Sequence, residues 1–173
     1  MFTVLASLFG CRGSDPDPLM DGDAGEAGKD VATDVDRSTA ERLVRDWRWQ
    51  HRLLVVRSDR DASLARQASL VEASLDAWRD REMKLVLLTT DGGLVVDRFV
   101  DGGPVGESFT SGVERLLVDR YGLEVGRDGI AAALVGKDGG VKARWSELVE
   151  PKAVFDLVDA MPMRIREMQE DER

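Results

Sequence analysis

One stretch of the sequence joins an apolar strand to the beginning of a helix and so indicates the fold: Leu53-Leu54-Val55-Val56-Arg57-Ser58-Asp59-Arg60-Asp61-Ala62-Ser63. Its four consecutive apolar residues predict a strand, and a polar turn follows them. Ser63 is the predicted N-cap of the helix, whose apolar residues recur at intervals of three and four: Leu64, Ala68, Val71, Leu75 and Trp78. An apolar strand that leads into such a helix indicates an α/β domain.

Further strands and a second helix are predicted downstream. Residues 84–90 form a nearly uninterrupted apolar run before a glycine turn, which indicates a central strand, and residues 94–96 predict a short edge strand. The sequence Asp101-Gly102-Gly103-Pro104 then breaks the chain. An apolar face that stops at Gly122 predicts the second helix, and it comprises Phe109, Val113, Leu116, Leu117 and Tyr121.

The C-terminal part predicts a hairpin and an interrupted helix. Residues 130–135 and 141–145 flank Lys137-Asp138-Gly139-Gly140, whose glycines supply the positive φ angles of a tight turn. Pro151 begins the last helix, and its apolar face comprises Val154, Val158, Met161, Ile165 and Met168. Because Pro162 lies inside this segment, we expect a kink or a break there.

The chain is predicted to contain one folded domain. A short helix is expected near residues 38–41, where a hydroxyl cap precedes Glu41, and Trp47 and Trp49 follow and are expected to cover the edge of the core. Residues 39–173 are therefore assigned to the domain. Residues 12–38, rich in Asp, Gly, Ala, Pro and Ser, predict an acidic disordered linker, and residues 1–11 an apolar N-terminus too short to span a bilayer.

The expected order over residues 51–169 is strand, helix, strand, helix, strand, strand, helix. This order suits a thioredoxin-like α/β domain with three layers and a central mixed sheet. The only cysteine, Cys11, lies far outside it, so the domain lacks active-site cysteines. The proline that commonly precedes the third core strand of thioredoxins is also missing, since Asp128-Gly129 stands there. Serine cannot replace a thiolate in redox exchange, and we expect no thiol-dependent turnover of peroxide or disulfides.

The net charge of −9 over 173 residues comes mainly from one segment. Residues 13–36 carry eight acids against Lys29 alone, while the rest of the chain has 25 acids and 23 bases. The folded part is thus nearly neutral, and its basic residues mostly alternate with acids along helical faces. This pattern argues against a nucleic-acid partner, which requires clustered Lys and Arg.

The N-terminus is similar to the end of a bacterial lipoprotein signal, in which a cysteine becomes lipidated. Leu8-Phe9-Gly10-Cys11 matches that signal at three positions, although Phe9 is bulky and no Lys or Arg precedes the apolar run. A true start codon further upstream explains both the shortness and the missing charge. We therefore expect a location in the cell envelope or periplasm, with membrane contact only through a lipid on Cys11. The alternative is a cytoplasmic protein with an incidental thiol.

Three stretches resemble landmarks of one family. They are Trp47-Arg48-Trp49-Gln50-His51-Arg52-Leu53-Leu54-Val55-Val56, Val135-Gly136-Lys137-Asp138-Gly139-Gly140-Val141-Lys142-Ala143-Arg144 and Asp159-Ala160-Met161-Pro162-Met163-Arg164. Over residues 45–169 the chain resembles the domain of unknown function numbered 4174, a peroxiredoxin-like domain also found in sushi-repeat-containing extracellular proteins and in coiled-coil domain-containing protein 80. The resemblance implies a thioredoxin-like fold and, in bacterial relatives, a small protein that is often exported. It implies no catalytic residues.

The candidate site lies where the first strand meets the first helix. A helix N-terminus attracts anions, and the functional hypothesis is that Arg57 and Arg60 bind a carboxylate or phosphate, with Ser58 and Ser63 donating hydrogen bonds. Against it, Asp59 and Asp61 are expected to cap the helix themselves, which leaves no net attraction for a ligand.

Two functions follow from these alternatives. One is a non-catalytic interaction domain that binds a protein or a small anionic ligand, with no cofactor and no metal. The other is a thiol-independent or redox-associated enzyme that uses the turn around Ser58. The only histidine, His51, precedes the first strand at its opposite end, which disfavours a serine nucleophile activated by histidine.

Overall fold

The fold is built around one mixed sheet. The computed structural model describes residues 32–127 and 129–171, whose strands lie in the order β4-β3-β2-β1-β5-β6. The strands are β1 (Arg52–Ser58), β2 (Met83–Thr89), β3 (Gly92–Val100), β4 (Gly103–Thr110), β5 (Ile130–Val135) and β6 (Val141–Trp145). The β1 strand pairs in parallel with β2 and antiparallel with β5, and the remaining neighbours are antiparallel.

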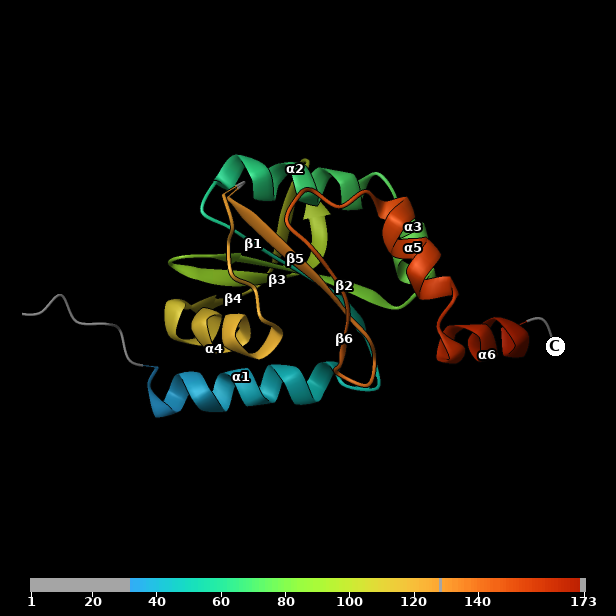
Figure 1. Cartoon of the computed structure of the whole chain (residues 1–173), viewed down its shortest axis with the longest axis horizontal. Helices are drawn as coiled ribbons and strands as arrows, with labels where there is room; N and C mark the ends of the chain where they lie inside the picture. The colour runs from blue at the N-terminus through green and yellow to red at the C-terminus, as the bar shows by residue number, and fades with distance from the viewer. Residues whose placement is uncertain (1–31, 128, 172–173) are drawn as a thin grey trace, which may run out of the picture.

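Helices cover both faces of the sheet and so form three layers (Figure 1). They are α1 (Asp34–Trp47), α2 (Asp61–Glu72), α3 (Leu75–Asp80), α4 (Ser111–Tyr121), α5 (Pro151–Asp159) and α6 (Pro162–Asp171). One face carries α1 and α4, whereas α2, α3 and α5 lie on the other, and α6 projects at the C-terminal end (Figure 1). The expected three-layer α/β class with a central mixed sheet is confirmed.

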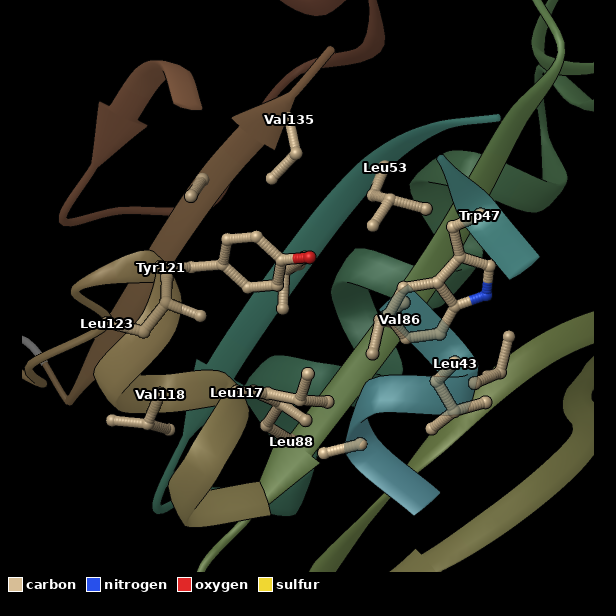
Figure 2. Packing of buried hydrophobic residues seen from close by; sticks show 14 of the residues in the cluster. Leu43, Trp47, Leu53, Val86, Leu88, Leu117, Val118, Tyr121, Leu123 and Val135 are labelled. Carbon is tan, nitrogen blue, oxygen red and sulfur yellow. The ribbon is translucent and has the colours of Figure 1, made fainter. Parts of the chain in front are cut away.

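Two apolar cores stabilise these layers, and successive residues of β1 contribute to opposite ones. Leu53 and Val55 point into the core beneath α1 and α4, which Figure 2 shows, while Leu54 and Val56 point into the core beneath α2 and α5. Because the side chains of a strand alternate between faces, a continuous apolar run is required where both faces are covered. The strand predicted at residues 53–56 is confirmed, and both of its faces are covered.

Several other predicted elements are also confirmed. The apolar run at residues 84–90 forms β2, which lies inside the sheet between β1 and β3. The glycine turn joins β5 to β6, with Gly139 at a φ of 81°. The last helix is interrupted: α5 ends at Asp159 and α6 begins at Pro162, because proline has no N–H to continue the helix.

Residues 94–96 do form a strand and the chain does turn after Val100, but two details of the prediction for residues 91–110 were wrong. Instead of a short edge strand, β3 extends over nine residues to Val100 and has a neighbour on each side. The edge strand is β4, and Phe109, which was assigned to the second helix, belongs to it. The β4 strand contains two glycines and a proline, so its own propensity is low, and its pairing with β3 stabilises it. At Gly106 a Cβ atom would lie 1.8 Å from the Val95 carbonyl oxygen, so the close approach of these strands requires glycine.

The boundary of the domain also differs from the prediction. The α1 helix begins at Asp34 rather than near residue 38, so the C-terminal end of the predicted linker is helical. Thr33 is its N-cap, and Thr33 and Asp36 form a reciprocal capping box. The helix predicted after Ser63 is likewise not continuous, because α2 ends at Glu72 and α3 begins at Leu75.

Some expectations fall outside the described residues: the apolar N-terminus 1–11 with Cys11, residues 12–31 of the linker, and Asp128. Among residues 32–127 and 129–171, no helix is long and apolar enough to cross a membrane. Within the same ranges, no group of three or more His, Cys, Asp or Glu side chains is arranged to hold a metal ion.

Candidate functional site

The predicted turn at the end of β1 is held by hydrogen bonds within the chain. Ser58 is buried at 2% exposure, and its hydroxyl donates to the Gly129 carbonyl oxygen at 2.6 Å while accepting the Arg60 N–H at 3.0 Å. Because the Ser58 proton goes to a carbonyl oxygen, no base activates this hydroxyl. Ser58 therefore ties the turn to the start of β5, at the opposite end of β1 from His51.

Arg57 is paired with a buried acid that the sequence did not single out. Its Nε donates to Oε1 of Glu114 at 2.8 Å, and its Nη1 donates to the Leu123 carbonyl oxygen at 3.3 Å. Burial raises the pKa of Glu114 above its ordinary value, and the attraction to Arg57 offsets this only in part. The pair joins β1 to α4. The Arg57 guanidinium, which was predicted to bind an anion, is therefore already bonded to a carboxylate of the chain.

The remaining residues of the predicted site do not converge. Arg60 is the N-cap of α2 without a side-chain cap, so neither Asp59 nor Asp61 caps the helix, and Ser63 lies inside the first turn rather than at the cap. The hollow at this turn measures about 200 Å³ and is lined by Arg57 and Ser58 but not by Arg60 or Ser63. Anion binding at the four predicted residues stays a prediction.

A larger groove is lined by residues from α1, from the turn after it and from α4. The α1 and α4 helices cover the face of the sheet opposite to α2 (Figure 1). The volume of the groove is about 530 Å³, within the range of ligand sites in proteins. Apolar side chains form its floor: Ala40, Val44, Leu116 and Leu117. Charged side chains and one tryptophan line its rim: Arg37, Glu41, Arg45, Arg48, Trp49 and Arg120. We call this feature the arginine groove.

Helical periodicity builds one wall of the arginine groove. Arg37 and Arg45 belong to α1 and Arg48 is its C-cap residue, and their spacing of eight and three residues places them along one side of the helix. Arg120 is contributed by α4, near its C-terminus. Four arginines against Glu41 alone leave the lining strongly positive.

Within the described part of the chain, Arg45 is the one arginine of the groove that forms an ion pair. The ion pairs of α1 within the described residues involve Arg42 with Asp46 and Glu107, and Arg45 with Asp46 at 3.9 Å. Arg45 is 73% exposed, so that contact is weak. Arg48 lies over the Trp49 ring, and its guanidinium carbon is 5.3 Å from the ring centroid. This cation–π contact orients the Arg48 guanidinium beside the groove.

Trp49 is held at the mouth of the groove in an unusual conformation. Its side chain is 59% exposed, and its φ of 69° lies in the left-handed region that bulky residues rarely adopt. The Trp49 N–H donates to the Lys137 carbonyl oxygen at 2.7 Å, which fixes the turn after α1. The expectation that Trp49 covers the core was wrong, whereas Trp47 is buried at 5% exposure. An exposed aromatic on a strained backbone is typical of a binding surface.

Sequence reasoning missed the arginine groove. The spacing of Arg37, Arg45 and Arg48 was available as a signal once the helix was known to begin at Asp34. The contribution of Arg120 had no signal, because only the packing of α4 against α1 brings it near. The groove therefore became visible only in the tertiary structure.

The stretches that carry the family resemblance meet in a second place, at the other end of β1. Arg52 and Lys137 both bind Glu167 of α6, while Arg164 binds the Asp80 side chain and also donates to its carbonyl oxygen at 2.9 Å. The full network has as many acids as bases: Arg52, Arg81, Lys137 and Arg164 with Asp80, Glu82, Asp159 and Glu167. A cavity of about 320 Å³ adjoins it, but its cations Arg52, Lys137 and Lys142 are already paired with acids. This network fastens α6 to the domain.

The topology defines the class of this protein. A central strand paired in parallel with β2 and antiparallel with β5, followed by the β5–β6 hairpin and a final helix, is an α/β arrangement of the thioredoxin-like type. The chain belongs to the family described as domain of unknown function (DUF4174), whose model matches residues 43–167. The family likeness foreseen from the three landmark stretches is confirmed.

Solved peroxiredoxin structures resemble the chain at low identity. The reduced 2-Cys peroxiredoxin of Plasmodium vivax matches with a TM-score of 0.49 and 14% identity, covering 70% of this chain and 71% of the other. Plasmodium yoelii Prx1a, modified at the N-terminus, matches with a TM-score of 0.46 and 14% identity, covering 71% and 80%. Plasmodium yoelii thioredoxin peroxidase I matches with a TM-score of 0.37 and 16% identity, covering 74% and 78%.

Proposed function

We propose that this protein is a non-catalytic interaction module of the cell envelope that binds an acidic polypeptide segment in the arginine groove. The observation that carries the proposal is the set of four arginines around an apolar floor, with the exposed Trp49 at its mouth. The apolar floor offers contact to the apolar parts of a bound chain, while the exposed guanidinium groups of the rim donate charge-assisted hydrogen bonds to its carboxylates.

The length of the groove favours a polypeptide over a small anion. Arg37 in α1 and Arg48 at its C-cap are eleven residues apart, which corresponds to about 16 Å along the helix axis. One phosphate or carboxylate group cannot contact both. An extended chain spans that distance with about five residues, so several of its acidic side chains can each meet an arginine.

The turn at the end of β1 supports the non-catalytic part of the proposal. Where a thiol would be needed, Ser58 is buried, and its hydroxyl is committed to two backbone groups. The groove itself offers cations and an aromatic ring but a single acid, Glu41, which is exposed. These groups suit recognition of carboxylates rather than proton transfer.

Replacing Arg45 and Arg48 together with glutamine should weaken binding of a synthetic hexa-aspartate peptide. Each arginine offers a charge-assisted hydrogen bond, so we expect a loss of about tenfold in affinity at low salt. The dissociation constant is measured by calorimetry on the full chain. Both side chains are exposed, so the free energy of unfolding should change by less than about 0.5 kcal/mol.

The matched control replaces Arg66 and Arg98 with glutamine. These arginines are exposed on α2 and β3, outside the groove, and their loss changes the net charge equally. The control pair should retain peptide affinity within about twofold, since distant exposed charges are largely screened by salt. An equal loss in both double variants would show that the peptide responds only to net charge, and the proposed site would have to be abandoned.

The envelope location is supported by the sequence around Cys11. If the gene begins upstream with a Lys- or Arg-bearing segment, the mature protein should start at Cys11, carry a lipid and sediment with membranes. Mass spectrometry of the protein purified from its native cells tests this. Detection of an intact, unmodified Met1 would contradict it.

A further inference from the structure

The chain itself contains a segment with the chemistry that the arginine groove recognises. Residues 13–31 carry six acids against Lys29 alone, and they directly precede the described chain: Asp15, Asp17, Asp21, Asp23, Glu26 and Asp30. The groove carries four arginines against Glu41. We propose that residues 15–30 bind in the arginine groove of the same molecule and compete there with an external acidic segment, a proposal that rests on the function proposed above.

The structure fixes the point from which this segment departs. The Thr33 side chain and the Asp36 side chain close the capping box at the start of α1, and Asp36 also accepts the Thr110 hydroxyl at 2.5 Å. Thr110 is the N-cap of α4, so the starts of both groove walls are joined here. Arg37, the first arginine of the groove, follows Thr33 by four residues, about one helical turn.

The segment is long enough to run along the whole groove. At about 3.3 Å per residue, residues 15–30 span up to about 50 Å when extended, whereas the arginines of α1 cover about 16 Å. A segment bound in this way would run back along α1, so that Asp30 and Glu26 would meet Arg37 and the acids before them would meet Arg45, Arg48 and Arg120. The charge pattern is thus complementary along the length of α1.

Because residues 15–30 belong to the same chain as the arginine groove, even weak ion pairs are sufficient for them to bind there. Exposed ion pairs contribute only about 0.2–1 kcal/mol each, so a free acidic peptide binds weakly. A short connection raises the effective concentration of the attached segment to about the millimolar range, which is enough to populate such a weak complex. An external partner must then displace the segment, and its apparent affinity falls in proportion to the fraction of open groove.

Proximity is tested with a spin label on the full chain carrying Ala24→Cys and Cys11→Ser. The label should broaden the amide signals of α1 and α4 around Arg45, Arg48 and Arg120, and leave α5 on the opposite face unaffected. Changing the six acids to their amides, or adding about 1 M salt, should remove the broadening, because salt screens exposed charges. Equal broadening of both faces, or broadening that survives neutralisation of the acids, would overturn the proposal.

Mixing separates contacts within one molecule from contacts between copies. Spin-labelled chain without an isotope label is added to isotope-labelled chain without a spin label, and no broadening is expected. Broadening in the mixture would mean that the segment binds a second copy, which contradicts binding within one chain.

Competition separates this inference from the proposed function. The hexa-aspartate peptide should bind the chain with its six acids neutralised about three- to tenfold more tightly than the unchanged chain. Equal binding to both chains would overturn the intramolecular proposal and leave the proposed function standing. No binding to either chain would overturn both.

Discussion

Replacing Arg52 with methionine should lower the free energy of unfolding by about 3 kcal/mol, because it removes one partner of a buried ion pair. Arg52 is 1% exposed, and it donates to the Arg81 carbonyl oxygen and to both carboxylate oxygens of Glu167, each at 3.0 Å. Methionine fills a similar space but leaves that carbonyl oxygen unpaired and Glu167 with fewer cations. Urea denaturation measures the loss.

The same substitution should loosen α6 before the rest of the domain. Ile165 of this helix is 40% exposed, while its Arg164 and Glu167 connect it to the domain through charges. Hydrogen exchange should therefore show less protection in α6 and unchanged protection in β2. Arg42→Met is the control, since Arg42 is 41% exposed in its pair with Glu107 and should cost less than about 1 kcal/mol. Equal losses for both variants would contradict a stabilising role of the network.

The effect of Arg52 should depend on pH with a defined sign. Burial alone would raise the pKa of Glu167, but the hydrogen bonds from Arg52 and Lys137 outweigh it and lower this pKa below its ordinary value of 4.5. A lowered pKa stabilises the folded state above pH 4.5, and this stabilisation disappears as the pH falls through the pKa of the folded state. The stability difference between the unchanged chain and Arg52→Met should therefore shrink from about pH 6 to about pH 3. A constant difference would mean that Glu167 is not involved.

Trp47→Ala should cost about 3–5 kcal/mol of stability, because it leaves a cavity in the core beneath α1. Figure 2 shows Trp47 among the buried residues of this core, together with Leu43, Leu53 and Val86. Trp49→Ala is the matched control, since it removes the same side chain two residues away at 59% exposure, and should change stability by less than about 0.5 kcal/mol. If Trp47→Ala does not fold, Trp47→Phe should still be measurably less stable than the Trp49 variant. Similar losses at both positions would contradict the assignment of Trp47 to the core.

The elements that were predicted well are those whose local sequence is sufficient to specify them. The apolar run of β2, the glycine turn between β5 and β6 and the break before Pro162 each depend on neighbouring residues. The family landmarks were likewise readable from three separate stretches. By contrast, β4 was not predicted, because its Gly- and Pro-containing sequence becomes a strand only when β3 supplies the pairing partner.

In the candidate site too, local features were predictable from the sequence and contacts between distant residues were not. The turn after β1 was located from the sequence, and Arg57 and Ser58 do lie at its hollow. The ion pair between Arg57 and Glu114 was not predictable, because 57 residues separate the two partners in the chain. The helix start was misplaced because Ser38 and Thr39 offer the same capping chemistry as Thr33, and the bond from Thr110 to Asp36 adds support for the earlier cap.

By itself, the sequence determined the α/β class, the absence of a thiol from the folded domain, and the acidity of the segment before α1, because each depends on residue identity and short-range spacing. Only the tertiary structure decided that Trp47 is buried and Trp49 exposed, and that arginines of α1 and α4 line one groove. The physical reason is that exposure and convergence of charges depend on how helices pack across the sheet. That packing is settled by contacts between residues far apart in the chain.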